Sequence, residues 1–305
     1  MNSKKIGIAI VAPGGYTFDD AALAEGIARL QAQGHTVHNY FDTRGVFQRF
    51  GGTDAARLEQ LNAAAADPEV QVVMALRGQY GMTRLLPQID FARMAASGKI
   101  FVGYSDFTAF HMGLMAKTGA QSYAGPMFLS DFASGEPLPF TVDDFFSCLT
   151  NDTHTIVQGA SGNPVLNTTG RIWGGNLAML VSLIGTDYFP QVDGGILFVE
   201  DVNEHPYRVE RMLLQLMQCG VLARQKAVIL GDFSAYKLGP HDNGYDFDAM
   251  LAYVRATLPC PVLTGLQFGH GRTRVTIPFG ASATLESDAQ QFVLTLRDYP
   301  HLAHA

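Results

Sequence analysis

Ser105 stands where a short apolar run gives way to a helical pattern. The run 99–103 (KIFVG) predicts a buried strand, and the residues directly after Ser105 predict a helix. A serine at such a strand-to-helix turn can present its hydroxyl above a sheet, and the backbone N–H of Asp106 at the helix N-terminus could donate to an oxyanion. The simpler interpretation is that Ser105 only caps the helix. The G-x-S-x-G signature of α/β-hydrolases is also incomplete, because Phe107 occupies the second glycine position.

Glu200 and His270 are the residues that could activate such a serine. Glu200 follows the apolar run 196–199, where a carboxylate is costly to bury unless it accepts hydrogen bonds, so it either caps a helix or orients a histidine. His270 lies between two glycines after another apolar run, which leaves the imidazole accessible, although a lone loop histidine is more often inert. A serine needs a base to accept its proton, and the base needs a carboxylate to fix its tautomer. Together the three residues predict a Ser105–His270–Glu200 triad.

A glycine-containing stretch with two arginines follows the apolar run 70–76. Gly78 and Gly81 would let the backbone approach a ligand, and Arg77 or Arg84 could bind a carboxylate. The alternative is an ordinary strand-to-helix turn with solvated arginines.

No group of residues in the sequence has the spacing of a metal site. Glu204 and His205 are adjacent, so their side chains diverge, and no second ligand pair accompanies them; we expect a solvated loop there. Cys148, Cys219 and Cys260 form no CxxC motif and leave an odd thiol. A disulfide framework is therefore not expected, and a reducing compartment fits best.

Alternating strands and helices precede Ser105 and would position it. Strands are predicted at 6–11, 36–41, 70–76 and 100–103, with helices up to Gly34 and from about 53 to 66. Thr17 is the expected cap of the first of these helices. The alternation predicts a parallel sheet covered on both faces, which binds ligands at the carboxyl ends of its strands. The loops after Val11, Leu76 and Gly103 are therefore where a site is expected.

The segment 151–169 is polar, contains glycine and proline, and has no helical period. We take it as the linker between a nucleophile-bearing N-terminal domain (1–150) and a C-terminal domain (170–305) that supplies the acid and the base. Further strands are predicted at 196–199, 227–230, 262–266 and 292–296, together with an amphipathic helix over 206–219 that Gly220 ends. The expected fold is α/β, with an N-terminal parallel sheet flanked by helices and a C-terminal mixed α/β domain.

Composition excludes several classes of protein. A chain of 305 residues suggests about two domains, and 47% hydrophobic residues exclude intrinsic disorder. Lys and Arg number 21 against 28 Asp and Glu, a net charge of −7 without any basic run, so we expect no nucleic-acid or membrane partner. The apolar run 6–12 is short and lacks a cleavage site, so a buried strand is favoured over a signal peptide. We therefore expect a cytoplasmic location.

The motifs in this chain, taken in order, resemble those of the LD-carboxypeptidases, the muramoyltetrapeptide carboxypeptidases that are serine peptidases of murein recycling. The resemblance covers nearly the whole chain. It rests on the motifs Val11-Ala-Pro-Gly, Arg77-Gly-Gln-Tyr-Gly-Met-Thr-Arg-Leu-Leu-Pro-Gln-Ile-Asp90, Gly103-Tyr-Ser-Asp-Phe-Thr-Ala109, Trp173-Gly-Gly-Asn-Leu, Glu200-Asp-Val with Pro206-Tyr-Arg, and Gly269-His-Gly.

The resemblance implies an active site in the crevice between two domains and an enzyme without a cofactor, commonly a homodimer. Its substrate would be the murein tetrapeptide, free or linked to its sugar, from which the terminal D-alanine is removed. By motif, Ser105 is implied as nucleophile, His270 as general base and Glu200 as its orienter. The implied oxyanion hole uses backbone N–H groups of Asp106 and of the Gly78-Gln79 turn. Candidate substrate-binding residues are Arg77, Tyr80, Arg84, Trp173 and Asn176.

The chain departs from the family pattern Arg-Gly-Gly-Tyr-Gly at Gln79. If that position needs a positive φ, a residue other than glycine is strained there by about 1–2 kcal/mol. Either the turn differs in this chain, or Gln79 lines the substrate pocket. The resemblance also leaves open whether diaminopimelate or lysine precedes the D-alanine, whether the sugar is required, and how a dimer is arranged.

Two other functions are compatible with the pattern. One, within the same family, is an immunity-type hydrolase of processed peptidyl-nucleotide antibiotics, although the sequence has no obvious insertion to hold a nucleotide. The other is a non-catalytic, two-lobed solute-binding protein, against which the full set of triad residues counts. Release of free D-alanine from murein tetrapeptide would separate all three.

Overall fold

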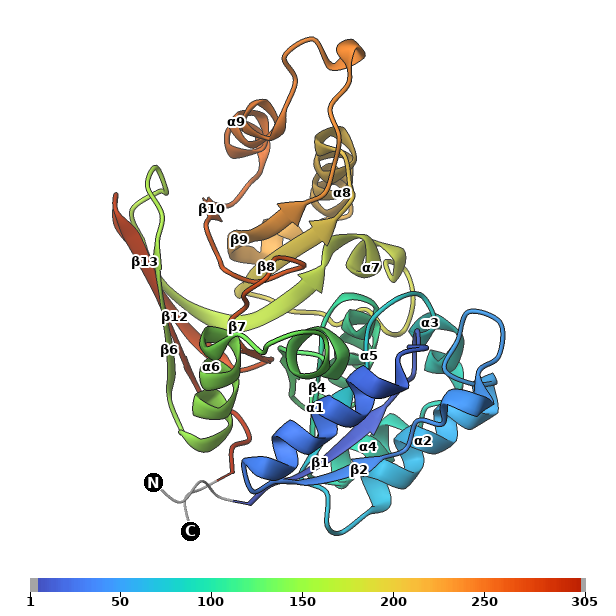
Figure 1. The fold of residues 1–305 in the computed structure, drawn as a ribbon. Helices are drawn as coiled ribbons and strands as arrows, with labels where there is room; N and C mark the ends of the chain where they lie inside the picture. Colours follow the sequence, from blue (N-terminus) through green and yellow to red (C-terminus); the bar gives the residue numbers. More distant parts are fainter. Residues whose placement is uncertain (1–4, 303–305) are drawn as a thin grey trace.

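Two β-sheets organise the chain, one drawn mainly from its first half and the other from its second half (Figure 1). The computed structural model describes residues 5–302. The first sheet has the order β11-β5-β4-β3-β1-β2; β1 to β5 run parallel, and β11 pairs antiparallel with β5. Its strands are β1 (Gly7–Val11), β2 (Thr36–Asn39), β3 (Val72–Ala75), β4 (Ile100–Gly103), β5 (Ser122–Ala124) and β11 (Ile277–Phe279).

Helices flank this first sheet, so that β1, β3 and β4 are buried along their whole length. Burial on both faces is what a parallel sheet with crossover helices requires, and it explains the uninterrupted apolar runs of these strands. The helices are α1 (Asp20–Ala32), α2 (Asp54–Ala66), α3 (Met82–Leu85), α4 (Phe91–Ala96), α5 (Thr108–Thr118) and α6 (Pro139–Thr150). The expected cap of α1 was wrong. The carboxylate of Asp19 caps the helix by accepting from Ala22 N–H, whereas the Thr17 hydroxyl accepts from Asp19 N–H.

The second sheet is mixed and has the order β10-β9-β8-β7-β12-β13-β6. Strands β7 to β10 run parallel, and β12, β13 and β6 continue the sheet antiparallel from β7. Its strands are β6 (His154–Gly159), β7 (Leu166–Asn176), β8 (Gly195–Val202), β9 (Gln225–Ser234), β10 (Val262–Thr264), β12 (Ser282–Ser287) and β13 (Gln291–Arg297). The accompanying helices are α7 (Leu177–Ser182), α8 (Pro206–Gln218) and α9 (Phe247–Thr257).

Helix α8 shows why the amphipathic pattern was informative. Its buried residues Pro206, Val209, Leu213 and Leu216 recur every three or four positions and so form one stripe. Proline occupies the first turn, where its missing N–H leaves no helical bond unmade, and Gly220 follows the helix with φ +80°. The predicted end of the helix is therefore confirmed to within one residue.

The segment 151–169 is not the irregular linker that its composition suggested. It contains β6, which pairs with β13 at the edge of the second sheet, and the first residues of β7. Strand β7 alternates between exposed and half-buried residues where it pairs with β12, and it becomes fully buried where it pairs with β8. One face of the antiparallel part is solvated, which accounts for the polar sequence.

The predicted fold class is confirmed: an N-terminal parallel sheet flanked by helices is followed by a second, mixed sheet. The two parts are interlocked, because β11 returns from the second half of the chain to the edge of the first sheet. Within residues 5–302, no helix combines the length and the apolar character that crossing a membrane would need.

Candidate active site

Ser105 lies on a sharp turn directly after β4. The residue has φ +60°, in the left-handed region that side chains other than glycine rarely adopt. It opens a short 3₁₀ segment, Ser105–Phe107, that leads into α5, and no side chain caps this segment. The interpretation of Ser105 as a helix cap is therefore wrong. The strained turn instead exposes the hydroxyl to a cavity, which is the local geometry of a nucleophile elbow.

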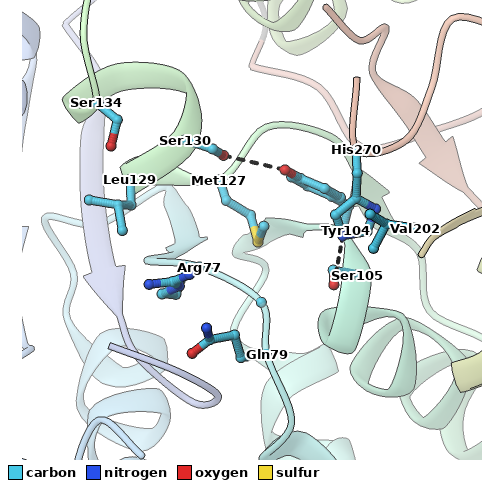
Figure 2. A pocket seen from close by; sticks show the side chains of 11 residues that line it. Arg77, Gln79, Tyr104, Ser105, Met127, Leu129, Ser130, Ser134, Val202 and His270 are labelled. Carbon is cyan, nitrogen blue, oxygen red and sulfur yellow. Dashed lines mark hydrogen bonds between the residues drawn. The ribbon is translucent and has the colours of Figure 1, made fainter. Parts of the chain in front are cut away.

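His270 contacts both of its predicted partners. Its Nε2 lies 3.1 Å from Ser105 Oγ, and its Nδ1 lies 2.7 Å from Glu200 Oε2 (Figure 2 shows the first contact). The loop that carries it requires glycine at position 269, where φ is +145° and an added Cβ would lie 2.8 Å from Asp232 Cβ and 3.0 Å from Glu200 Oε2. The glycine thus lets the histidine loop approach the carboxylate closely.

Glu200 is fully buried within β8, which continues to Val202 and so extends past the predicted strand end. The amide Nδ2 of Asn176 donates to Glu200 Oε1 over 3.2 Å and to Asp201 Oδ1 over 3.0 Å. Asp201 also accepts from the backbone N–H of Ala178, over 2.9 Å. Each oxygen of Glu200 therefore has a partner, as a buried carboxylate requires. The buried Asn176 thus holds the carboxylate of Glu200 in place, and its contact with a substrate stays a prediction.

The imidazole of His270 has a pKa raised above its usual value of 6.5. Burial on its own lowers the pKa of the ring, but the hydrogen bond to Glu200 and the negative charge of that carboxylate outweigh it. Asp201 and Asp232 add to the same effect at longer range. The surrounding carboxylates therefore stabilise the imidazolium relative to a free histidine, and the imidazolium is the species that forms when a serine gives up its proton.

The turn that carries Gly78 lies against the nucleophile. A Cβ added to Gly78 would lie 2.7 Å from Ser105 Oγ and 3.6 Å from the backbone nitrogen of Asp106, so a side chain here would block the serine. The carboxylate of Asp106 accepts from Met82 N–H over 2.7 Å and ties the two segments together. Burial raises the pKa of Asp106 to about 6, against the opposing effect of that hydrogen bond.

Gln79 has φ +66° and also lines the cavity beside Ser105. Of the two alternatives, a different turn is not observed, because Gln79 keeps the positive φ that would favour glycine. The second alternative fits the structure, since the side chain of Gln79 lies exposed at the pocket. Non-glycine residues in this conformation carry strain, and such strain concentrates at functional sites.

The structure separates the remaining candidate substrate-binding residues. Arg77 lines the cavity, whereas Tyr80 is 47% exposed outside its lining. Arg84 is held away from the cavity by Asp54, over 2.7 Å. Trp173 is fully buried in β7, where its indole N–H donates to Gln225 over 2.8 Å, so it has no surface to offer a substrate. The proposal for Trp173 was therefore wrong, whereas a substrate-binding role for Arg84 stays a prediction that its ion pair with Asp54 does not favour.

Sequence reasoning missed one wall of the cavity, which has a volume of about 620 Å³. This wall comes from the segment after β5, where a π-helical turn, Leu129–Ala133, lies beside Tyr104. Asp131 in that turn forms a buried ion pair with Arg274, whose guanidinium carbon lies 4.4 Å from the centre of the Tyr104 ring. The sequence of this segment carried no motif, and only the fold brings it to Ser105.

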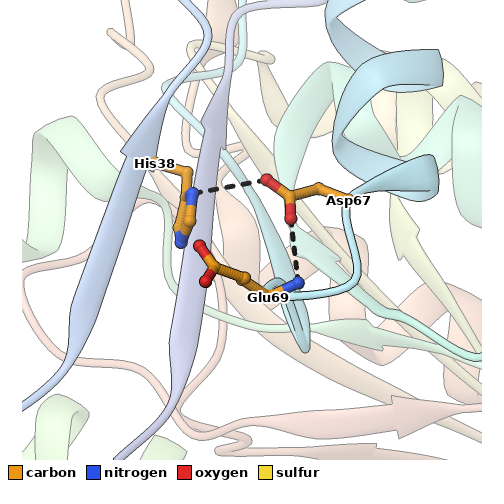
Figure 3. Close-up of side chains that lie close together, drawn as sticks. All are labelled: His38, Asp67 and Glu69. Carbon is orange, nitrogen blue, oxygen red and sulfur yellow. Dashed lines mark hydrogen bonds and ion pairs between the residues drawn. The ribbon is translucent and has the colours of Figure 1, made fainter.

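One group of side chains in the described residues could in principle hold a cation. His38, Asp67 and Glu69 have potential ligand atoms within 4.8 Å of one another (Figure 3). The Asp67 carboxylate already pairs with His38 at 3.3 Å and accepts from Tyr40 Oη at 2.7 Å. His38 lies on β2, and Asp67 and Glu69 precede the amino end of β3, whereas Ser105 follows the carboxyl end of β4. Glu204 and His205 do not converge either, since they pair separately with Arg208 and Asp242.

We therefore expect EDTA and zinc chelators to leave the activity unchanged, because within residues 5–302 the one group of three potential metal ligands is His38, Asp67 and Glu69, which does not include Ser105 or its partners. Hydrolysis rates measured before and after dialysis against chelator test this. Activity that is lost on dialysis and restored by Zn²⁺ would replace the serine mechanism with a metal-dependent one.

The buried carboxylate of Glu200, the imidazole of His270 and the hydroxyl of Ser105 are hydrogen-bonded in series, and Ser105 lies on a turn after a parallel strand. This arrangement defines a serine hydrolase site. Two family models match the chain: the LD-carboxypeptidase N-terminal domain over residues 8–125 and the LD-carboxypeptidase C-terminal domain over residues 169–285. The chain therefore belongs to the LD-carboxypeptidase family and is a serine carboxypeptidase, as the motifs predicted.

The similarity to known proteins covers most of the chain. A solved structure of muramoyltetrapeptide carboxypeptidase from Oxalobacter formigenes is 50% identical, with a TM-score of 0.93 over 96% of this chain and 99% of that one. A Streptomyces coelicolor protein named as a carboxypeptidase is 32% identical and covers 94% of this chain and 92% of its own length. A microcin self-immunity protein of Escherichia coli is 28% identical over 80% of this chain and 79% of its own.

Proposed function

We propose that this enzyme releases the terminal D-alanine from murein tetrapeptide, as a cytoplasmic LD-carboxypeptidase of peptidoglycan recycling that acts without a cofactor. The observation that carries the proposal is the hydrogen-bonded series Ser105–His270–Glu200 at the wall of a cavity. The similarity of the chain to a muramoyltetrapeptide carboxypeptidase supports it. The related Bacillus subtilis protein named as a murein peptide carboxypeptidase, 29% identical over 80% of this chain, supports the same substrate class.

In the proposed reaction Ser105 Oγ attacks the carbonyl that precedes D-alanine, while His270 Nε2 takes the hydroxyl proton. Glu200 holds the tautomer that leaves Nε2 free and stabilises the imidazolium. The oxyanion accepts hydrogen bonds from the backbone N–H of Asp106 and from the Gly78-Gln79 turn, which lies against the serine. His270 then returns the proton to the leaving amine, D-alanine departs, and water, deprotonated by the same imidazole, hydrolyses the acyl-enzyme.

The test is to incubate the purified protein with murein tetrapeptide and to measure free D-alanine together with the shortened peptide. A second reaction offers a peptidyl-nucleotide antibiotic, because the relation to the microcin self-immunity protein favours that substrate as the alternative. We expect release of D-alanine and a lower kcat/KM for the antibiotic. Hydrolysis of the antibiotic alone would assign the immunity function, and binding without hydrolysis of either would favour a solute-binding protein. The homodimer stays a prediction, checked by light scattering.

We expect kcat/KM to rise with pH through a midpoint above 6.5. Only neutral His270 can accept the serine proton, and the carboxylate beside it raises the pKa of the imidazole, so the active form becomes populated at higher pH. A pH profile of kcat/KM measures this midpoint. A flat profile between pH 5 and 9 would contradict the role of His270 as general base.

A further inference from the structure

The cavity beside Ser105 has a single charged arginine in its lining, Arg77. Its guanidinium is half-buried and donates to the backbone carbonyl of Tyr16 over 3.0 Å. Among residues 5–302, no carboxylate lies within ion-pairing distance of it. The rest of the lining is neutral apart from His270, with apolar contacts from Met127 and Leu129. When a ligand displaces water from such a site, a cation without a counter-ion is stabilised best by an anionic group.

The backbone on which Arg77 sits is fixed relative to the nucleophile. Gly78 carbonyl accepts from Gly15 N–H over 2.8 Å, and the buried Arg57 donates to Gly81 carbonyl over 3.0 Å. Asp106, next to Ser105, holds the far end of the same loop through Met82 N–H. The loop that follows Arg77 is therefore fixed by hydrogen bonds to Gly15, Arg57 and Asp106. Arg77 also directly precedes Gly78, which lies against Ser105.

The other nearby arginines are already compensated or lie outside this cavity. Arg84 pairs with Asp54, and Arg274 is buried against Asp131. Arg272 is exposed and lines a neighbouring hollow of about 210 Å³ that Glu136 also lines. The sequence offered Arg77 or Arg84 as the residue that binds a carboxylate, and the structure favours Arg77.

We infer that Arg77 binds the C-terminal carboxylate of the peptide substrate and so restricts cleavage to the last residue. When the last residue of a peptide is removed, that residue directly follows the scissile bond and carries the terminal carboxylate. The cationic partner of this carboxylate must therefore lie close to the groups that hold the scissile carbonyl. Arg77 meets this condition because it lines the same cavity as Ser105 and Gly78. The inference rests on the proposed function, since it assigns one end of the substrate to one side of the same cavity.

The decisive comparison uses two peptides, the murein tetrapeptide with a free C-terminal carboxylate and the same peptide with a C-terminal amide. The amide keeps every internal carboxylate, so the pair isolates the terminal one. We expect the wild type to prefer the acid by about 10²-fold in kcat/KM, the scale of a lost charged hydrogen bond. Arg77→Met should lower kcat/KM for the acid to the level of the amide and leave the amide unchanged, while Arg77→Lys should keep part of the preference because it keeps the charge but not the fork.

Arg272→Met is the matched control, because it removes an exposed arginine from the neighbouring hollow and should keep the full acid preference. Loss of the preference in this variant alone would move the carboxylate site to Arg272 and overturn the inference. An equal loss by Arg77→Met for acid and amide would show that Arg77 binds an internal carboxylate or only supports the loop, which also overturns it.

Binding to variants with Ser105→Ala provides a measurement that does not depend on turnover. Titration calorimetry should show tighter binding of the acid than of the amide, and Arg77→Met in the same background should remove the difference. If the wild type releases no D-alanine, the proposed function fails, whereas equal affinities for acid and amide refute the role of Arg77 whatever the turnover.

Discussion

Ser105→Ala is expected to abolish hydrolysis while the fold and substrate binding stay close to those of the wild type. The hydroxyl makes one hydrogen bond, with His270 Nε2 at 3.1 Å, and it caps no helix. Its removal therefore leaves no helix end without its cap. Alanine at this position keeps the Cβ and the same φ of +60°. We expect kcat to fall by several orders of magnitude, with residual catalysis of at most about 10³-fold over water from the remaining groups.

The measurement is the rate of D-alanine release, with a thermal melt and a peptide titration on the same sample. Ser182→Ala is a suitable control, because Ser182 is an exposed serine on α7 whose hydroxyl donates to the Met179 carbonyl. It should keep the wild-type kcat. Turnover close to the wild type in Ser105→Ala would remove Ser105 from the mechanism and the triad with it.

The three central residues could be found from the sequence because each follows, or lies in, a strand with an unmistakable apolar run. A parallel sheet brings the carboxyl ends of its strands to one edge, so residues far apart in sequence were expected to meet there. Ser105 obeys this rule within the first sheet, and Glu200 and His270 obey it within the second. What the pattern did not contain is the packing of the two sheets that brings these edges together.

The errors have a common physical origin in tertiary context. Strands β5 and β11, which the sequence analysis did not predict, have three residues each, and β11 is held at the sheet edge by pairing with β5, a neighbour distant in sequence. Trp173 and Arg84 belong to stretches that resemble the family, yet one is in the core and the other pairs with Asp54. A motif identifies residues that a fold needs, and burial decides which of them can meet a substrate.

Glu200→Gln tests whether the acid orients the base or only stabilises the strand that carries it. Glutamine keeps the size of the side chain, but its amide donates where His270 Nδ1–H needs an acceptor. The imidazole should then adopt the tautomer with its proton on Nε2, facing Ser105, where it cannot accept a proton. By analogy with the aspartate-to-asparagine change in the general Ser-His-Asp triad, which lowers kcat about 10⁴-fold, we expect a fall in kcat of about 10³ to 10⁴ with little change in KM.

The matched control is Asp201→Asn, because Asp201 shares the Asn176 amide with Glu200 and accepts from the backbone of α7 without touching the imidazole. We expect this variant to lose thermal stability and to keep kcat within about tenfold of the wild type, since the triad's tautomer is unaffected.

The pH profile distinguishes the two roles of Glu200 even when both variants are less stable. In the wild type the carboxylate raises the pKa of His270 against the opposing effect of burial. Removing the negative charge leaves burial dominant, so the rising limb of the residual kcat/KM should move to lower pH in Glu200→Gln. A strand-stabilising acid would give a lowered melting temperature, a kcat close to the wild type and an unmoved pH midpoint. An orienting acid gives the low kcat together with the shifted midpoint, because one contact of 2.7 Å controls both the tautomer and the charge of the base.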